Sequence, residues 1–257
     1  MQYSRHESAL YMECADPSQG GMETGETPSH TLFGWPVQEG RLGHTRHHTL
    51  SAGDVVSLGA DACRRLTRAI AALLNLYLQD AGQVLVVGLG NGALTADRLG
   101  TAVCSRLTLG GVPLGQRTLY SLVPGVSAVT GIPTDQLVAH TAALLHADRI
   151  VAIDALCACR AASLGKVVQF SDVGLTPGSG TTAAADTDAP EISTRTMPCP
   201  VVTVGVPTVI RTTLPDGGDL RYLVSAGDTD RTVERWGSLL SSAILQAATT
   251  PDPPQIS

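Results

Sequence analysis

The chain has 257 residues, of which 43% are hydrophobic, so it can bury one large core. Its net charge of -6 and its 17 scattered Lys and Arg residues leave no basic stripe to neutralise phosphates, and we expect no direct binding to nucleic acid. No apolar stretch is long enough to span a bilayer, and residues 1–20 carry charges instead of the apolar segment of a signal peptide. The composition therefore predicts a cytoplasmic protein without a membrane partner.

The first part of the chain, residues 1–50, differs in composition from the rest. It is rich in Gly, His, Thr and Pro and shows neither helical nor strand periodicity. We expect it to form an irregular N-terminal extension that contains a few strands. Residues 51–257 are expected to fold as one α/β domain.

Helical and strand patterns alternate through this domain. Apolar residues at helical spacing predict helices over residues 60–80, 95–107, 134–147 and 230–248. Short β-branched runs predict strands over residues 84–89, 149–154, 166–172 and 200–210. Thr95 and Thr134 are expected to cap the second and third helices. The alternation is typical of an α/β fold in three layers, with a mostly parallel sheet and helices on both faces.

Two aspartates follow apolar strands of this domain. Asp97 lies in VLVVGLGNGALTADRLG and Asp154 in RIVAIDALCACR. Because the carboxyl ends of parallel strands meet at one edge of a sheet, we expect both carboxylates at that edge. Two carboxyls within hydrogen-bond reach cannot both ionise near neutral pH, so one keeps its proton while the other activates a water. Such a pair predicts peptide-bond hydrolysis without a cofactor, although either acid alone could simply cap a helix.

Other site chemistries fit the sequence less well. Gly88, Gly90 and Ala93 form G-x-G-x-x-A after a strand, but the next segment lacks the acid that a dinucleotide site needs. We interpret these glycines as a tight turn that brings backbone amides close to a site. A G-x-S-x-G nucleophile elbow is missing. The cysteines lack zinc-ribbon spacing, and the histidines of HTRHH are far in sequence from the aspartates, so we predict no metal site.

Five motifs resemble the germination (spore) protease family in their order and approximate spacing. They are VLVVGLGNGALTADRLG, VPGVSAVTGIPT, IVAIDALCACR, QFSDVGLTPGSG and VVTVGVPTVI, and they cover residues 83–212. The resemblance implies an atypical aspartic-type endopeptidase that degrades small acid-soluble spore proteins. It also implies a zymogen with a short N-terminal propeptide, a homotetramer, and a location in the spore core or forespore. Residues 51–257 would then be the catalytic domain, and the extension would include the propeptide.

The resemblance also implies roles for individual residues. The two catalytic aspartates of the family fall in the motifs that contain Asp97 and Asp154, and we expect Gly88, Gly90 and Asn91 to support them. The chain departs from the family pattern before the first aspartate, where Ala96 replaces the usual proline. An inactive binding homologue that kept the fold is therefore one alternative.

Hydrogenase maturation proteases are the other alternative. They resemble the chain in a Gly-x-Gly-Asn turn, in an acid near Asp97 and in an Ile-Asp strand end like Ile153 and Asp154, and we expect the same fold. They also carry a histidine that helps to sense nickel. Asp172 stands at the comparable strand end here, where we expect it to support the site or to cap the following turn.

Overall fold

The structure is a computed structural model that describes residues 29–42, 45–107, 113–158, 160–175, 191–213 and 221–249. The other residues are outside this description, and they include the predicted propeptide start and the PGSG turn. The described strands are β1 (Ser29–Leu32), β2 (Trp35–Leu42), β3 (Thr45–Ser51), β4 (Gln83–Gly88), β5 (Pro113–Leu114), β6 (Arg117–Leu122), β7 (Arg149–Ala158), β8 (Val167–Ser171), β9 (Val201–Thr213) and β10 (Arg221–Val224). The α-helices are α2 (Ala60–Tyr77), α3 (Leu99–Cys104), α4 (Ser127–Thr130), α5 (Thr134–Leu144) and α6 (Thr229–Thr249), with short 3₁₀ turns η1 (Thr95–Asp97) and η2 (Ala161–Ser163).

All described strands belong to one sheet with the order β1-β2-β3-β8-β9-β7-β4-β6-β5, and β10 also pairs with β9. Only the pairs β4–β6, β4–β7 and β7–β9 are parallel, and the six other described pairs are antiparallel. The prediction of a mostly parallel sheet is therefore wrong, because β8 enters the sheet antiparallel to β9 and continues into the antiparallel strands β3, β2 and β1. The parallel part is confined to β9, β7, β4 and β6; Asp154 lies in β7, and Asp97 lies in the turn η1 that comes after β4.

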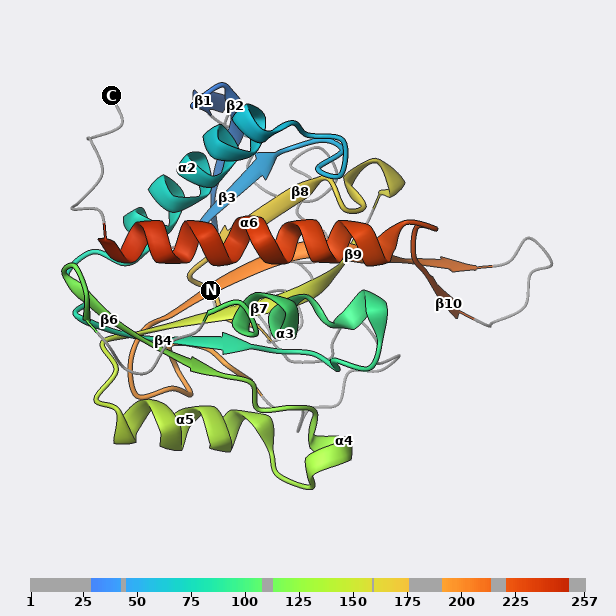
Figure 1. Cartoon of the computed structure of the whole chain (residues 1–257). Coiled ribbons are helices and arrows are strands. Elements are labelled where there is room, and N and C mark those ends of the chain that lie inside the picture. Colours follow the sequence, from blue (N-terminus) through green and yellow to red (C-terminus); the bar gives the residue numbers. More distant parts are fainter. Residues whose placement is uncertain are drawn as a thin grey trace.

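Helices cover both faces of the sheet, as predicted (Figure 1). Helices α2, α3 and α6 pack on one face against alternate strand residues such as Val151 and Ile153. Helix α5 packs on the other face against the intervening residues, which include Ile150 and Ala152. This alternation follows from the period of two along a strand.

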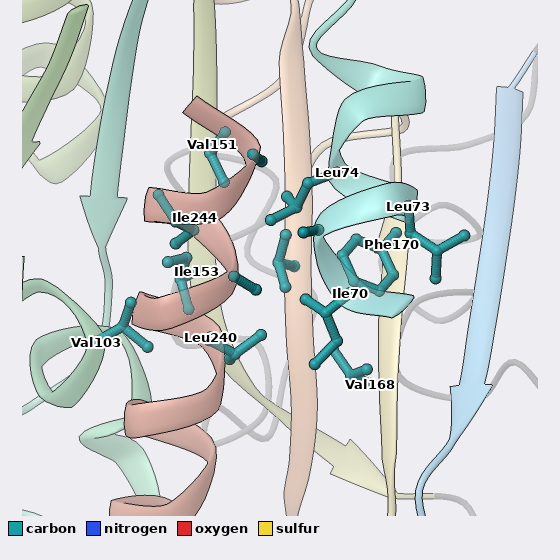
Figure 2. Close-up of a cluster of buried hydrophobic side chains, with 14 of the residues drawn as sticks. Ile70, Leu73, Leu74, Val103, Val151, Ile153, Val168, Phe170, Leu240 and Ile244 are labelled. Carbon is teal, nitrogen blue, oxygen red and sulfur yellow. The ribbon is translucent and has the colours of Figure 1, made fainter. Parts of the chain in front are cut away.

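The larger core cluster joins α2 and α6 to the sheet (Figure 2). Helix α2 turns one apolar stripe inward, and Ile70 and Leu74 on this stripe are essentially inaccessible to solvent. Trp236 of α6 is also fully buried, and its indole Nε1 donates a 2.8 Å hydrogen bond to the Gly165 carbonyl. These contacts hold α6 across the sheet, so that its first turn lies at the carboxyl edge of the parallel strands (Figure 1).

The N-terminal part of the chain is more regular than expected. Strands β1, β2 and β3 form an antiparallel meander, and β3 pairs with β8 inside the sheet. Val37 and Leu50 of this meander are fully buried in the main core. Residues 29–42 and 45–50 thus extend the sheet of the α/β domain, which the sequence periodicity did not indicate.

Two predicted helix starts also differ from the structure. The predicted helix 95–107 is split into the 3₁₀ turn η1 and helix α3, and Thr95 caps neither with its side chain. Thr134 is the first residue of α5, and its hydroxyl lies 3.1 Å from the Ser127 hydroxyl instead of capping the helix.

Candidate active site

The turn that carries Asp97 is held by local hydrogen bonds. Asn91 N–H donates to Oδ2 of Asp97 at 2.7 Å, and the Asn91 side-chain Oδ1 accepts a bond from Ala93 N–H at 3.0 Å. Asp97 N–H donates to the Leu94 carbonyl at 2.9 Å, which closes the 3₁₀ turn η1. Burial raises the pKa of Asp97 above its usual value, and the Asn91 hydrogen bond partly opposes this shift.

Glycine is required at two places in this loop. Gly90 has a φ of +93°, and a Cβ there would overlap the carbonyl oxygen of Asp97. Gly88 faces Gly100 of α3 so closely that a Cβ on either residue would overlap the neighbouring backbone. The predicted supporting glycines thus permit close backbone approach, and Asn91 supplies the amide that bonds to the carboxylate.

Strand β9 also holds the turn that carries Asp97. Thr208 of β9 is 2% exposed, and its hydroxyl donates a 2.5 Å hydrogen bond to the carbonyl of Ala96. The register between β7 and β9 shifts here, since Leu156 pairs with Pro207 but Cys157 pairs with Val209. Thr208 is left at this irregularity, which allows its side chain to reach η1. The sequence did not single out this residue, because its role depends on a contact more than 100 residues away.

Asp154 lies inside strand β7, which continues beyond the predicted end at residue 154. The residue is 7% exposed and pairs with Gly205 of β9, and its Oδ1 accepts a 2.9 Å hydrogen bond from Ala155 N–H. Gly88, the last residue of β4, pairs with Ile153. Asp154 is therefore one position beyond the carboxyl end of β4.

A short path of bonds connects the two aspartates. Leu89 N–H donates a 2.9 Å hydrogen bond to the carbonyl of Ile153, next to Asp154. Two residues later, Asn91 N–H binds the Asp97 carboxylate. Both acids therefore belong to the carboxyl edge of β4, as the strand pattern predicts. Neither is an α-helix N-cap, because Asp154 lies in a strand and Asp97 ends a 3₁₀ turn.

Buried polar residues lie beside Asp154 on the α5 face of the sheet. Gly205 of β9 pairs with Gln169 of β8 on one side and with Asp154 of β7 on the other. Ser171 of β8 likewise pairs with His47 of β3 and with Thr203 of β9. The side-chain Oε1 of Gln169 is buried without a hydrogen-bond partner among the residues that the structure describes. It is thus an available acceptor two strands from Asp154.

His47 belongs to this polar group but carries no charge near neutral pH. It is 5% exposed, and burial, followed by the neighbouring His48, lowers its pKa to about 3. The HTRHH segment therefore contributes a neutral strand residue to the sheet. The sequence did not reveal this polar group, because its members come from separate strands.

Asp172 lies away from the two acids. Its Oδ1 accepts a 2.7 Å hydrogen bond from Arg46 N–H, and its Oδ2 lies 3.9 Å from the Arg46 guanidinium. Because β8 is antiparallel to β9, its carboxyl end points toward the amino ends of β7 and β9, opposite to the edge with Asp154. The predicted supporting residue therefore pairs with β3 instead of orienting Asp97 or Asp154.

A cavity of about 360 Å³ lies beside the turn that carries Asp97. Thr208 lines this cavity and also bonds to Ala96, so the cavity and the turn share a wall. Lys166, Asp54 and Asp228 supply charged groups to the lining. The space is large enough for a side chain of a bound polypeptide.

The described residues contain no group of three or more His, Cys, Asp and Glu side chains that could hold a metal ion. None of the described helices combines the length and apolar character needed to cross a bilayer.

Comparison with known families gives a match over most of the chain. Residues 45–226 match the family model of germination protease. The germination protease of Bacillus velezensis is 33% identical over 180 residues, which are 64% of this chain and 48% of that protein. That of Priestia megaterium is 35% identical over 145 residues, which are 53% of this chain and 38% of that protein. The chain thus spans about half or less of the length of these relatives.

A solved structure also shares similarity with the chain. The nickel-iron hydrogenase maturation protease HycI from Thermococcus kodakarensis superposes with a TM-score of 0.40 and 15% sequence identity. The match covers 67% of this chain and 98% of that protein.

Proposed function

The chain belongs to the germination protease family, and we propose that it is an endopeptidase in which Asp97 and Asp154 activate water for attack on a peptide bond. The observation that supports this most directly is the short bonded path through Leu89 and Asn91, which joins the two acids at one edge of the sheet. Residues 92–95, just before Asp97, are exposed in the part of the chain that the structure describes, which makes this turn accessible to a polypeptide.

The environment of Asp97 suggests which of the two acids is protonated at the start of the reaction. Its pKa is raised, mainly by burial, so we assign it the proton at the start of the reaction. Ionised Asp154 takes a proton from water, and the hydroxide attacks the carbonyl carbon while Asp97 donates its proton to the carbonyl oxygen. The tetrahedral intermediate then collapses: one of its hydroxyl groups gives a proton back to Asp97 as the C=O bond re-forms, the C–N bond breaks, and Asp154 gives the proton that it took from water to the leaving amine.

Family membership suggests the biological setting. We propose that the substrates are small acid-soluble spore proteins in the spore core, and that the chain acts as a homotetramer after removal of an N-terminal propeptide. No cofactor has a role in this proposal.

The departure from the family pattern at Ala96 bears on the alternative of an inactive binding protein. The Ala96 carbonyl is bonded to Thr208, so the turn before Asp97 is held without a proline ring. This contact favours an active enzyme.

The decisive test is cleavage of a purified small acid-soluble spore protein, followed by mass spectrometry of the products. We expect internal cleavage that is insensitive to a chelator. An intact substrate, under conditions in which the Bacillus velezensis relative cleaves it, would establish the inactive binding protein instead.

A further inference from the structure

One carboxylate of α6 braces the helix that follows the turn η1. Arg98 and Arg106 flank α3, and both bind Glu234: Arg98 donates a 2.7 Å hydrogen bond to Oε1, and Arg106 pairs with Oε2. Gly237, one turn later on α6, lets α3 approach closely, because a Cβ there would lie 3.2 Å from the Cβ of Ala102. Glu234 and Gly237 thus hold both ends and the middle of α3 against one face of α6.

Arg98 depends on Glu234 more than Arg106 does. Among the described residues, Glu234 supplies the only acceptor for the Arg98 side chain, and the Arg98 Nε is buried without a partner. Arg106 also donates to the carbonyl oxygen of Ala102 in α3. Loss of the Glu234 carboxylate would therefore free the guanidinium of Arg98, whereas Arg106 would keep one acceptor.

A freed Arg98 would place a mobile cation next to Asp97, which directly precedes it in the chain. Burial is the main cause of the raised pKa of Asp97 and the Asn91 hydrogen bond opposes it, and no charged side chain is among the causes. The Arg98 guanidinium thus leaves this carboxyl unaffected while Glu234 binds it. An opposite charge within about 4–6 Å would favour the ionised form and lower the pKa of Asp97.

The elements around η1 carry other charged groups. The turn packs against α6, β7 and β9. The charged residues of these three elements are Asp230, Arg231, Glu234 and Arg235 of α6, Arg149 and Asp154 of β7, and Arg211 of β9. None of them is a cause of the shifted pKa of Asp97. Arg98 is the cation closest to Asp97 along the chain, so its placement matters most for the charge around this carboxyl.

We propose that Glu234 is a positioning residue, which holds Arg98 against α6 and away from the carboxyl group of Asp97. This inference rests on the proposed function, in which Asp97 begins the reaction with a proton. A cation beside Asp97 would remove that proton at a lower pH, and the proposed acid would then be lost. Glu234 prevents this loss and, through Arg98 and Arg106, also fixes the chain that leaves the Asp97 turn.

The main variant is Glu234→Ala, and the readout is the dependence of kcat on pH. We expect the alkaline limb of this profile, where Asp97 loses its proton, to move to lower pH by about one pH unit. Below this limb, kcat should stay near the wild-type value. Because the three paired side chains are partly exposed, their ion pairs contribute little to stability, and we expect the variant to fold. An alkaline limb that stays in place, even with a lower kcat at every pH, would overturn the proposal.

A double variant tests whether the effect passes through Arg98. Glu234→Ala combined with Arg98→Gln has no guanidinium beside Asp97, so its alkaline limb should return to the wild-type position. A limb that remains shifted in the double variant would contradict the assignment. Asp230→Ala is the matched control, since Asp230 is an exposed carboxylate one turn before Glu234 and its removal leaves both Glu234 pairs intact. Its limb should not move, and a shift equal to that of Glu234→Ala would reject a specific hold on Arg98.

An NMR titration of isotope-labelled aspartate carboxyl groups separates this inference from the proposed function. The Asp97 signal is assigned by its absence in Asp97→Asn, and its pKa is read without any substrate. We expect a lower pKa of Asp97 in Glu234→Ala than in wild type, even if the chain cleaves no spore protein. Equal pKa values in the two proteins would overturn the inference, even if the chain is an active peptidase.

Discussion

The backbone amide of Asn91 donates a 2.7 Å hydrogen bond to the carboxylate of Asp97. This bond fixes one carboxylate oxygen and leaves the other available to carry a proton. It also connects the Asp97 turn to the loop after β4, whose Leu89 amide bonds to the carbonyl next to Asp154. The geometry of the proposed acid pair therefore depends on this loop.

Replacement of either acid by its amide should abolish cleavage without unfolding the protein. Asp97→Asn and Asp154→Asn keep the side-chain volume but cannot exchange the catalytic proton, so we expect kcat to fall by about 10²- to 10⁴-fold. Peptidase assays and circular dichroism of each variant provide the measurement. Asp172→Asn is the control and should retain activity, because Asp172 pairs with Arg46. Full activity in both amide variants would rule out the carboxylate mechanism.

The raised pKa of Asp97 predicts a specific dependence of stability on pH. A carboxyl with a higher pKa in the folded state than in the unfolded state is destabilising when ionised. Its cost is absent below the unfolded pKa of about 3.8, grows as the pH rises from there to the folded pKa, and stays constant above the folded pKa. Asp97→Asn should therefore gain stability relative to wild type as the pH increases.

Urea denaturation of both proteins at several pH values would measure this difference. If the free energies of unfolding of wild type and Asp97→Asn differed by the same amount at every pH, Asp97 would have an ordinary pKa. In the activity profile, the same shift predicts that kcat declines as the pH rises through the pKa of Asp97, because the proposed acid then loses its proton.

Removal of the Thr208 hydroxyl should misplace the turn that carries Asp97. Thr208→Val keeps the shape but loses the bond to the Ala96 carbonyl, and we expect a loss of about 1 kcal/mol in stability. The same change should lower kcat by about ten- to a hundredfold with little change in KM. Thr208→Ser restores a hydroxyl and should recover most of the activity. An unchanged kcat in Thr208→Val would mean that the other bonds of the turn suffice.

Alanine at Gly90 should be far more damaging than alanine at a comparable glycine. Both Gly90 and Gly131 have positive φ values, of +93° and +71°, but a Cβ at Gly131 would meet nothing within 4 Å. We expect Gly131→Ala to cost about 1 kcal/mol and Gly90→Ala to cost more and to abolish activity, because its Cβ overlaps the Asp97 carbonyl. Thermal denaturation and peptidase assays would compare them. Similar losses in both variants would show that backbone strain alone accounts for the effect.

Local patterns in the sequence were sufficient for much of the central fold. The apolar stripe of α2, the long final helix and the β-branched runs around the aspartates are all found close to their predicted positions. These features depend on residues within one or two turns or one strand, so a short window contains the information. The glycines of the loop after β4 were also recognisable, although their steric reason appeared only with Gly100 and Asp97 in place.

By itself, the sequence determined the elements of the parallel centre and singled out Asp97 and Asp154 in its motifs, because periodicity and motif order are local properties. Tertiary structure alone decided the direction of β8, which an apolar run does not encode, and so moved Asp172 to the opposite edge of the sheet. It also decided that Thr208 bonds to the turn that carries Asp97, and that Arg98 and Arg106, on either side of α3, line one groove with Arg231 and Arg235 of α6. Strand direction, register and helix docking depend on contacts between distant residues, and no local pattern records them.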